Sequence, residues 1–398
     1  MQIVIAGGGP GGASCARVLA KSGIRTVLIE ANPGGEKPCA GGIPSMLIDR
    51  YKIPDLLIKR KTSRAIFVAP SGLKVETDFP RDMYLGTVKR NEFDSHLRWS
   101  AEDAGVRIVQ GRVLDYEQKG IKLFIHYKDF DGTLRTTEAD FLVGADGAVS
   151  RIAQQAMGRA LPSVVAIQEE IALPEETMRN IGKFCIFNYS PAVSPDYYGW
   201  VFPKDDRVSV GVGTRYENRR MLNALLKRMK RFHENELEGG EVIKRNGALI
   251  PSGQYDEHGS GRVVLVGDAA GLVLPACGEG IYFAMRSGEI AGETIASLIR
   301  TRPDLIVTRY TNLVNEEFQP IFRYFEKIER LTYQSAESRE IFVRLARDKF
   351  MARKILKAWV AKEHVPTPIF KKIKVGMDLL VIRKQVRDTI ARQPNFGK

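Results

Sequence analysis

The chain has 398 residues, of which 44% are hydrophobic and 27% are charged, and its formal net charge is +13. This ordinary globular composition excludes a largely disordered or fibrous chain, and the length predicts two or three subdomains with a sizeable core. The basic balance favours an anionic partner, such as an acidic membrane surface or a phosphorylated substrate. Nucleic acid is disfavoured, because no nucleic-acid-binding module accompanies the charge.

The potential metal-binding and disulfide-forming residues are scattered. Cys15, Cys39, Cys185 and Cys277 form no Cys-x-x-Cys pair, and the five histidines have no metal-ligand spacing, so we expect no disulfide framework and no metal site. A reducing, cytoplasmic compartment fits this usage. We expect no signal peptide, because glycines break the N-terminal apolar run, and no membrane span, because no run of about 18 apolar residues occurs.

The N-terminal stretch predicts a strand, a tight turn, a helix and a second strand. An apolar run at residues 3–5 is followed by Gly7-x-Gly9-x-x-Gly12, a helix expected over residues 11–21, and a strand expected over 26–29 that ends at Glu30. This order is that of a dinucleotide-binding unit.

Each glycine of this turn has a separate expected task. Gly7 permits the sharp turn, Gly9 lets the backbone approach a pyrophosphate, and Gly12 lets the helix pack on the strand. The helix N-terminal amides would face the anion. Glu30 is placed to accept hydrogen bonds from a ribose.

Residues 32–44 form a loop rich in glycine and proline, which excludes the interior of a helix or strand and permits a flat ligand to approach closely. Cys39, at its centre, is either a small buried residue or a thiol beside a redox ring. Arg90 lies at a later strand-to-helix junction, before a helix expected to end near Ala104. It is either solvated or holds a cofactor phosphate.

Residues 107–143 predict a meander of four strands, over 107–110, 112–118, 123–127 and 135–143, with Asp131-Gly132 as a hairpin turn. The meander ends in a second glycine turn, Gly144–Gly147, in which Asp146 lies between glycines.

Residues 160–250 are rich in strand-like segments and predict a second domain. Tyr198, Trp200 and Phe202 cluster beside glycines in one of these segments. Such aromatics can wall an apolar pocket or form core, and composition alone favours core. A basic helix is expected over Arg219–His233.

The chain then returns to the first domain through a buried strand at residues 262–266 and a glycine turn at 267–271. Asp268 is placed to accept hydrogen bonds from a polyol chain. Residues 275–284 are expected to start a long helix that runs to about Ile299, with N-terminal amides that would face an anionic ring edge. Acid-bearing glycine turns at both ends of the sequence predict one large dinucleotide rather than two small ligands.

The last stretch, residues 304–398, is helical by pattern, and its end is strongly basic. Residues 341–398 hold fifteen lysines and arginines against four acids. The basic residues of this stretch form either a membrane-binding face or a solubilising face. We therefore divide the chain into a cofactor domain at 1–160 with 260–300, which also includes part of the substrate domain near 60–90, a sheet-rich substrate domain at 161–259, and a basic helical region at 301–398.

Three motifs together resemble those of FAD-dependent oxidoreductases of the aromatic-hydroxylase fold: Gly7-x-Gly9-x-x-Gly12, Gly144-Ala145-Asp146-Gly147 and Gly267-Asp268-Ala269-Ala270-Gly271. Four others are similar to motifs of geranylgeranyl reductases, above all the branch that acts on the tail of chlorophyll and bacteriochlorophyll. These are Lys37-Pro38-Cys39, Tyr198-Gly199-Trp200-Val201-Phe202-Pro203-Lys204, Gly278-Glu279-Gly280-Ile281-Tyr282-Phe283-Ala284 and Ser338-Arg339-Glu340-Ile341-Phe342-Val343. The resemblance covers nearly the whole chain. One departure is Cys39-Ala40-Gly41-Gly42, where the photosynthetic branch usually has Cys-Gly-Gly-Ala.

The resemblance implies a mixed α/β fold. Its Rossmann-like FAD-binding domain is of the aromatic-hydroxylase, glutathione-reductase-like type, joined to an antiparallel-sheet substrate domain and a helical C-terminal region. It also implies an enzyme that saturates isolated double bonds of a geranylgeranyl chain, on the free diphosphate or on a prenylated pigment, to give a phytyl chain. NADPH or a reduced ferredoxin-type protein would supply the electrons. The protein would act in the cytoplasm, peripherally on the membrane face.

The expected site follows from the residues and the resemblance together. Cys39 is the candidate catalytic residue, as acid or gate beside the flavin. Tyr198, Trp200 and Phe202 are expected to bind the substrate chain. The expected FAD-binding residues are Gly7, Gly9, Pro10, Gly12, Glu30, Cys39, Ala40, Gly41, Arg90, Asp146, Gly267, Asp268, Gly278, Gly280 and Ile281.

Three alternatives stay open. An archaeal-type reductase of geranylgeranyl phospholipids shares the fold and the chemistry. An oxygen-using FAD-dependent aromatic hydroxylase shares the cofactor motifs, although the Cys39 loop and residues 198–204 argue against it. A flavin-binding protein without enzymatic activity is the third.

Overall fold

The structure is a computed structural model that describes residues 1–363 and 381–390. The chain forms two compact units. Unit 1 comprises Met1–Lys37, Arg90–Ser163 and Leu249–Phe322, and unit 2 comprises Pro38–Lys89, Val164–Ala248 and Arg323–Lys398. The domain division made from the sequence stays a prediction.

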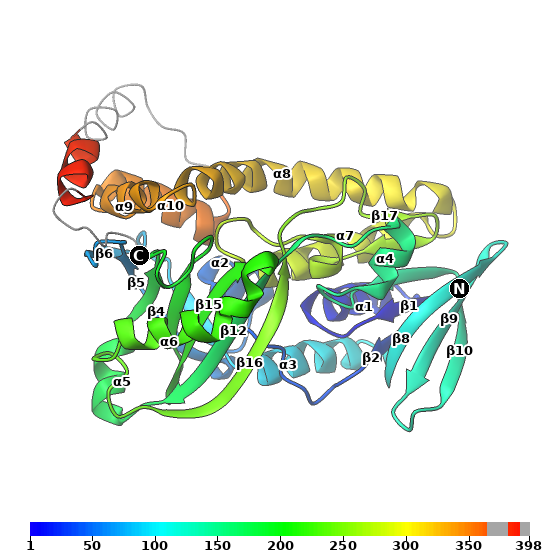
Figure 1. Ribbon diagram of the computed structural model, residues 1–398. Helices are drawn as coiled ribbons and strands as arrows, with labels where there is room; N and C mark the ends of the chain where they lie inside the picture. The colour runs from blue at the N-terminus through cyan, green and yellow to red at the C-terminus, as the bar shows by residue number, and fades with distance from the viewer. Residues whose placement is uncertain (364–380, 391–398) are drawn as a thin grey trace. The chain divides into compact units, whose positions relative to one another are not determined.

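Unit 1 is built on an eight-stranded sheet with the order β10-β9-β8-β2-β1-β11-β18-β17. Figure 1 labels β10, β9, β8, β2, β1 and β17 of this sheet. Its central strands β8, β2, β1, β11 and β18 are parallel neighbours, whereas β8, β9 and β10 form an antiparallel arm. The strands are β1 Gln2–Ala6, β2 Arg25–Glu30, β8 Arg107–Lys119, β9 Lys122–Asp129, β10 Leu134–Ala139, β11 Phe141–Gly144, β17 Gly259–Ser260 and β18 Val263–Leu265.

The predicted start of the chain is confirmed. Ile3, Val4 and Ile5 are fully buried, as expected for a parallel strand covered on both faces. The helices of this unit are α1 Pro10–Lys21, α3 Arg90–Asp103, α4 Arg151–Met157, α7 Ile281–Leu298 and the first part of α8 Ile306–Thr332, with the short turns η3 Gly267–Ala270 and η4 Pro303–Leu305.

The helices α1 and α7 approach each other with their backbones. A Cβ placed on Gly11 would lie 3.0 Å from the carbonyl oxygen of Ala284, and one on Gly288 would lie 2.2 Å from that of Gly11. A Cβ on Gly292 would lie 3.1 Å from the Cys15 carbonyl oxygen. Glycines are therefore required for this helix crossing.

The meander differs from its prediction in two places. The segments expected over 107–110 and 112–118 are one strand, β8, which tolerates a register shift between Val113 and Asp115. The strand expected over 135–143 is two, because β10 pairs with β9 while β11 pairs with β1. Asp140 lies between them and exchanges hydrogen bonds with the backbone of Gln2. The predicted hairpin turn is confirmed, with Gly132 at a φ of 88°.

Unit 2 contains a seven-stranded sheet with the order β16-β12-β15-β14-β13-β5-β6 and a small sheet with the order β3-β7-β4. The prediction that residues 32–44 contain no strand is wrong at its end, because Gly42–Pro44 forms β3 and pairs with β7. The strands are β3 Gly42–Pro44, β4 Ile58–Thr62, β5 Arg64–Val68, β6 Lys74–Asp78, β7 Leu85–Val88, β12 Ser163–Ala172, β13 Phe184–Asn188, β14 Gly199–Pro203, β15 Arg207–Arg215 and β16 Glu241–Pro251.

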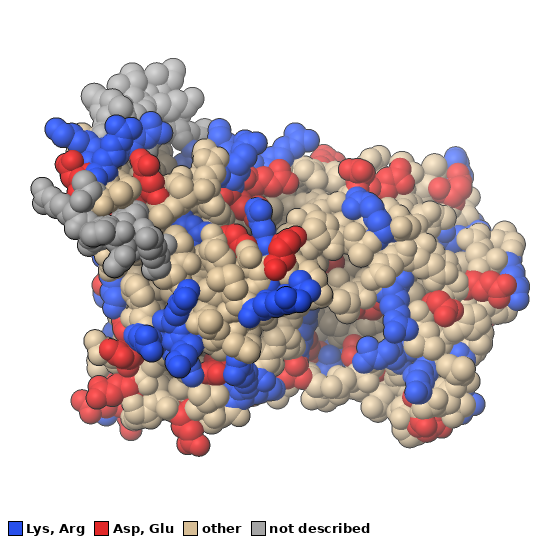
Figure 2. Space-filling model, viewed as in Figure 1, with Lys and Arg blue, Asp and Glu red and all other residues tan. Residues whose placement is uncertain are grey.

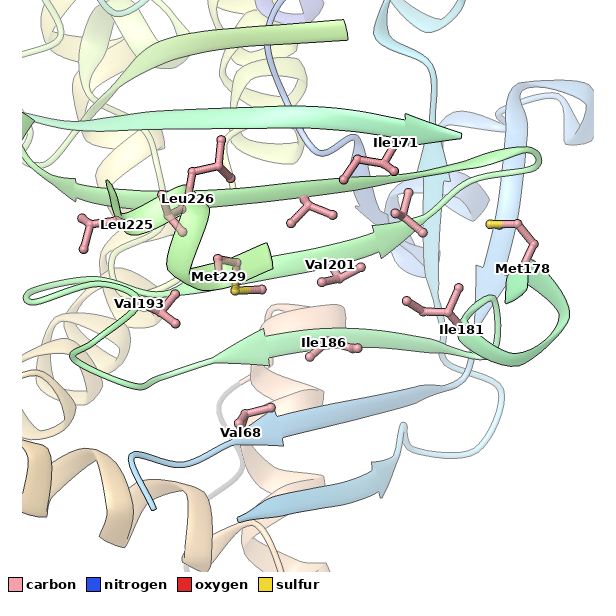
Figure 3. Packing of buried hydrophobic residues seen from close by; sticks show 13 residues of the cluster. Val68, Ile171, Met178, Ile181, Ile186, Val193, Val201, Leu225, Leu226 and Met229 are labelled. Atoms are coloured by element: carbon pink, nitrogen blue, oxygen red, sulfur yellow. The ribbon is translucent and has the colours of Figure 1, made fainter. Parts of the chain in front are cut away.

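One face of the large sheet carries an aliphatic core (Figure 3). Alternate residues of the strands, such as Val68, Ile186 and Val201, meet Leu225 and Met229 of a covering helix. The helices of unit 2 are α2 Ser45–Tyr51, α5 Glu175–Ile181, α6 Leu222–Phe232, α9 Ala336–Leu345 and α10 Lys349–Ala361, with the short turns η1 Asp55–Leu57 and η2 Tyr216–Met221.

The helical pattern expected after residue 304 is confirmed for α8, α9, α10 and residues 381–390. The rest of the basic stretch, 364–380 and 391–398, lies outside the described residues. Across the described ranges, none of the helices combines the length and the apolarity needed to cross a bilayer.

The helix α9 is held in unit 2 by a buried arginine. Arg339 is 1% exposed and donates hydrogen bonds to the carbonyl oxygens of Tyr189, Pro195, Ser194 and Tyr197, at 3.1, 2.6, 2.7 and 3.1 Å. Its guanidinium carbon also lies 5.0 Å from the centre of the Tyr333 ring. Burial lowers the pKa of Arg339, which is the cost of placing a cation here.

We predict that Arg339→Met destabilises the protein by at least about 3 kcal/mol, because four buried carbonyls lose their donor and each costs roughly 1–3 kcal/mol. Urea unfolding followed by tryptophan fluorescence measures the change. Arg353→Met, at an exposed position of α10, is the matched control and should change stability little. Equal stabilities of the two variants would contradict the role given to Arg339.

Candidate functional site

Three glycine turns converge at one edge of the sheet in unit 1. They follow β1, β11 and β18, which are adjacent parallel strands, so that their carboxyl ends lie side by side. A Cβ on Gly7 would lie 2.3 Å from the carbonyl oxygen of Ala145 in the second turn. A Cβ on Gly11 would lie 3.2 Å from the side chain of Val266, which leads into the third. Ligands bind at such strand ends in open α/β sheets.

The three glycines of the first turn differ in their surroundings. Gly7 has a φ of 104°, and Gly12 could not carry a Cβ, because it would lie 1.9 Å from the carbonyl oxygen of Gly7. A Cβ on Gly9 would meet no atom within 4 Å. Gly7 and Gly12 thus shape the turn, whereas Gly9 leaves open space beside the start of α1, where no side chain caps the helix.

We predict that Gly9→Ala folds normally but binds FAD roughly tenfold more weakly, because the added methyl enters the space that the cofactor would occupy. The φ of −71° at this position suits alanine. Flavin fluorescence titration of the apoprotein measures the affinity. Gly12→Ala is the contrasting variant, and it should lose thermal stability through its clash with Gly7. Unchanged FAD affinity in Gly9→Ala would contradict the assignment.

Glu30 is held in place by backbone amides. Its carboxylate accepts hydrogen bonds from the amides of Gly8, at 2.6 Å, and Asn32, at 2.8 Å. Arg98, which the sequence reasoning missed, donates to the carbonyl oxygens of Gly8 and Pro33, at 3.1 and 2.5 Å. It is 6% exposed. Arg98 therefore fixes both loops that flank the Glu30 carboxylate.

The arginine that was expected to hold a cofactor phosphate is already paired. Arg90 is 3% exposed and donates from Nε and Nη2 to the carboxylate of Asp94, at 2.9 and 2.7 Å. Arg90, Asp94 and Arg98 follow one another at four-residue spacing on α3. Three charged residues at this spacing lie on one face of a helix, and this pattern in the sequence could have pointed to Arg98. The phosphate contact of Arg90 stays a prediction.

Asp146 caps a helix. Its carboxylate accepts hydrogen bonds from the Ser150 hydroxyl, at 2.5 Å, and from the amides of Arg151 and Ile152, at 2.9 and 3.3 Å. Burial raises the pKa of this carboxyl, and these hydrogen bonds oppose the shift. The structure thus gives Asp146 a local role at the N-terminus of α4, and its contact with a cofactor stays a prediction.

The third turn carries an ion pair with the loop after β2. Lys37 donates from Nζ to Asp268, at 2.6 Å. Gly267, Gly271 and Gly278 have φ values of 57°, 75° and 66°, and Gly280 precedes α7 without a side-chain cap. The first amides of Ile281 and its neighbours thus start an uncapped helix beside α1. Two uncapped helix starts and an open Gly9 fit a bound pyrophosphate and an anionic ring edge.

Unit 2 holds the cysteine loop. The amide of Gly41 donates to the sulfur of Cys39, at 3.3 Å, and Gly41 has a φ of 79°. A Cβ on Gly41 would lie 2.2 Å from the carbonyl oxygen of Val88, so the turn needs glycine here. Cys39 is partly exposed. Ala40, between them, is partly exposed as well.

A glutamine that the sequence reasoning missed anchors this loop. Gln168 is 4% exposed and donates from Nε2 to the carbonyl oxygen of Cys39, at 3.2 Å. The hydroxyl of Ser209 donates to Oε1 of Gln168, at 3.1 Å, which fixes the orientation of the amide. Gln168 and Ser209 lie on neighbouring strands β12 and β15. No local sequence signal connects them with Cys39.

We predict that Gln168→Leu leaves the fold and FAD binding intact but raises the alkylation rate of Cys39 roughly twofold to tenfold, because the loop loses one hydrogen bond of about 0.5–1.5 kcal/mol. Mass spectrometry of the Cys39 peptide after timed treatment with iodoacetamide measures the rate. Cys277, also partly exposed, is the internal control. A rate equal to that of the unmodified chain would show that Gln168 does not hold the loop.

The predicted substrate residues belong to an aromatic layer on the other face of the large sheet. Tyr198, Trp200 and Phe202 are 7%, 7% and 6% exposed. Phe187 of β13 connects them, with its ring centre 6.0 Å from that of Tyr198 and 5.3 Å from that of Phe202. The layer also contains aromatic residues that were not among the expected substrate contacts, which are Phe67, Phe187, Tyr189, Tyr197, Tyr333, Phe342 and Trp359.

The strand β14 carries the buried indole of Trp200, and the residue that follows the strand, Lys204, is a buried cation. A Cβ on Gly211 would lie 2.1 Å from the indole ring of Trp200, whose Nε1 is buried and has no hydrogen-bond partner in the described part of the chain. Lys204 is 1% exposed and donates to both carboxylate oxygens of Glu170, at 2.7 Å each. A buried charge pair of this kind is costly unless it is fully satisfied.

In residues 1–363 and 381–390, no group of three or more His, Cys, Asp and Glu side chains could hold a metal ion.

A family model described as "FAD binding domain" matches residues 1–51 and 61–314. The protein is therefore an FAD-binding flavoprotein, and its predicted fold class and FAD cofactor are confirmed.

The chloroplastic geranylgeranyl diphosphate reductase of Oryza sativa subsp. japonica is 34% identical over 99% of this chain and 88% of its own length. The geranylgeranyl diphosphate reductase of Synechocystis sp. is 33% identical over 94% of this chain and 96% of its own length. A solved structure from Thermoplasma acidophilum, titled a geranylgeranyl bacteriochlorophyll reductase-like protein, has a TM-score of 0.74 at 22% identity and covers 98% of this chain and 99% of its own. That structure supports the fold. The chain belongs to the geranylgeranyl reductase family of FAD-dependent oxidoreductases.

Proposed function

We propose that this enzyme saturates isolated double bonds of a geranylgeranyl chain to give a phytyl chain. The observation that carries the proposal is the 34% identity to a geranylgeranyl diphosphate reductase over 99% of the chain, which includes both the glycine turns of unit 1 and the aromatic strand of unit 2. The free diphosphate and a prenylated pigment are the proposed substrates. We also propose that the enzyme works in the cytoplasm, on the surface of the membrane.

The cofactor is proposed to lie along the edge of unit 1 where the glycine turns meet. Gly7, Gly9, Pro10 and Gly12 would hold the pyrophosphate, Glu30 the ribose, and Asp268 the polyol chain. The amides near Gly278, Gly280 and Ile281 would face the ring edge. When bound and reduced, FAD supplies a hydride. In the other proposed contacts, Arg90 would hold a phosphate, Asp146 would lie beside the polyol, and Cys39, Ala40 and Gly41 would approach the ring.

The chemistry explains why an aromatic layer would be needed. An isolated alkene is a poor hydride acceptor, so the rate depends on how long the chain is held in a reactive position. Positioning of this kind can contribute roughly 7–11 kcal/mol to lowering a barrier. Tyr198, Trp200 and Phe202 offer rigid apolar surface for an isoprenoid chain. The other alkene carbon needs a proton, and a placed acid contributes roughly 10²–10⁴-fold.

We predict that Cys39→Ala binds FAD normally but loses alkene reduction, roughly 10²-fold or more, because a proton donor or gate beside the ring is removed. The test measures flavin affinity and product formation from geranylgeranyl diphosphate in the same preparation. Cys277→Ala is the matched control, since that thiol is also partly exposed but has no proposed task. Unchanged turnover in Cys39→Ala would remove Cys39 from the chemistry.

The function is tested by anaerobic incubation of the reduced protein with geranylgeranyl diphosphate, a geranylgeranylated pigment and a geranylgeranyl phospholipid, followed by mass analysis for added pairs of hydrogen atoms. Hydrogen addition to the diphosphate or the pigment supports the proposal. Addition to the phospholipid alone would favour the archaeal-type alternative, which the Ala40-Gly41-Gly42 departure keeps open. Product that contains oxygen from O₂ would favour a hydroxylase. No reaction with any of them would overturn the proposal.

The electron donor is proposed to be NADPH or a reduced ferredoxin-type protein. The sequence has no second Gly-x-Gly-x-x-Gly for a nicotinamide cofactor. NADPH would therefore bind transiently. Anaerobic bleaching of the flavin absorbance by each donor in turn distinguishes the two.

A further inference from the structure

The outer surface of η2 and α6 in unit 2 gathers cations. We call it the α6 basic surface and define it by five exposed residues. These are Arg219, Arg220, Lys227, Arg228 and Arg231. Figure 2 shows Lys and Arg side chains gathered where Figure 1 places α6.

The packing of α6 fixes which side chains face outward. Leu225 and Met229 are fully buried in the aliphatic core, so this side of the helix faces the sheet. Lys227 and Arg231 are four residues apart on α6, which places them on one face of that helix. Arg220 is exposed on the preceding turn η2. The packing of Leu225 and Met229 in the core therefore turns Lys227 and Arg231 outward, without ion pairs to described residues that would hold them there.

These cations are poorly neutralised. Arg220, Lys227 and Arg231 form no hydrogen bond or ion pair with any described residue, whereas Lys230, at the edge of the surface, pairs with Glu169 at 2.7 Å. Arg228 donates only to the carbonyl oxygen of Ala192. One acid, Glu217, is exposed within η2. Some cations elsewhere in unit 2, such as Lys61 and Arg64, have acidic partners.

Large apolar side chains are exposed among the same cations. Tyr216 and Met221 of η2 are 46% and 40% exposed, and the guanidinium carbon of Arg219 lies 4.5 Å from the centre of the Tyr216 ring. Ile243 of β16 is 43% exposed. Arg245, two residues further along that strand and thus on the same side, is hydrogen-bonded to Asn223 of α6. Ile243 therefore lies beside the helix.

We propose that the α6 basic surface, with Tyr216, Met221 and Ile243, docks the enzyme on an anionic lipid surface. This rests on the proposed function, because an isoprenoid substrate dissolves in the membrane and must be taken from it. Cations are attracted to anionic headgroups, while tyrosine and other apolar side chains enter the interface. An acidic protein would need the cations but not the exposed apolar residues, so a lipid surface is favoured.

Binding to vesicles tests the proposal with the full chain. The variant Arg220→Gln/Lys227→Gln/Arg231→Gln removes three charges and no hydrogen bond or ion pair with a described residue. Its matched control is Arg347→Gln/Arg353→Gln/Arg383→Gln, which removes three exposed charges from the basic C-terminal stretch. Affinity for vesicles of equimolar phosphatidylglycerol and phosphatidylcholine is measured by co-sedimentation. A cation at the surface contributes roughly fivefold, so the first variant should bind roughly a hundredfold more weakly, and the control clearly less so.

A second variant separates lipid from other polyanions. Tyr216→Ser/Met221→Ser keeps every charge, and it should weaken binding to the vesicles severalfold but leave binding to polyglutamate unchanged. Three outcomes overturn the proposal. The first is unchanged vesicle binding by the triple variant of Arg220, Lys227 and Arg231, and the second is an equal loss of vesicle binding in both triple variants. The third is that the triple variant of Arg220, Lys227 and Arg231 keeps vesicle binding but loses turnover with a protein electron donor. The last would assign the surface to an acidic protein.

Failure of the proposed function is measured separately. The unmodified enzyme and the α6 variant are both assayed with geranylgeranyl diphosphate dissolved in detergent, where no membrane is needed. If the proposed function is correct, both reduce it at the same rate. If neither does, the proposed function fails, and the vesicle measurement still decides whether this surface binds lipid.

Discussion

The cofactor edge of unit 1 depends on backbone contacts that leave no room for a single methyl group. Gly12 touches the carbonyl of Gly7, Gly7 touches that of Ala145, and Gly288 touches that of Gly11. These contacts bring together segments that are up to about 280 residues apart in the sequence. The two uncapped helix starts, at α1 and α7, lie near each other because the helices cross without intervening side chains. The positive ends of both helices are thereby available to one anionic ligand.

Unit 2 uses glycine for a different purpose. On β15, the sequence Val210-Gly211-Val212-Gly213 sends valines to the aliphatic core and leaves the opposite face bare. The rings of Trp200 and Tyr197 lie over the two glycines, where a Cβ would be 2.1 and 2.6 Å from them. The glycines thus make space for aromatic rings on a strand that is otherwise regular. The same sheet presents an aliphatic face to α6 and an aromatic face to residues of α9 and α10, which gives each face a separate task.

The sequence was sufficient for the elements whose signal is local. The first strand, turn and helix, the hairpin at Asp131-Gly132 and the long helix after Ile281 were all predicted, because periodicity and glycine spacing specify them. The split between β10 and β11 was missed, since strand partners are chosen by the whole sheet and not by the residues themselves. The same limit explains Gln168 and Phe187. Each is an ordinary residue in a regular strand, and only the tertiary contacts with Cys39 and Phe202 give it a structural role.

The cation of Arg339 is surrounded by four backbone carbonyls and an aromatic ring, and no carboxylate of the described residues lies within hydrogen-bond distance of it. Backbone carbonyls carry no net charge, so they are not protonated in acid as a carboxylate is, and dissolved salt screens their contact with the guanidinium only weakly. The attachment of α9 to the loop that precedes Tyr198 should therefore persist through acidification and through high ionic strength, conditions that weaken an ordinary surface ion pair. Acid or high salt would therefore loosen exposed ion pairs of this enzyme, such as that between Lys61 and Asp55, long before it released that loop.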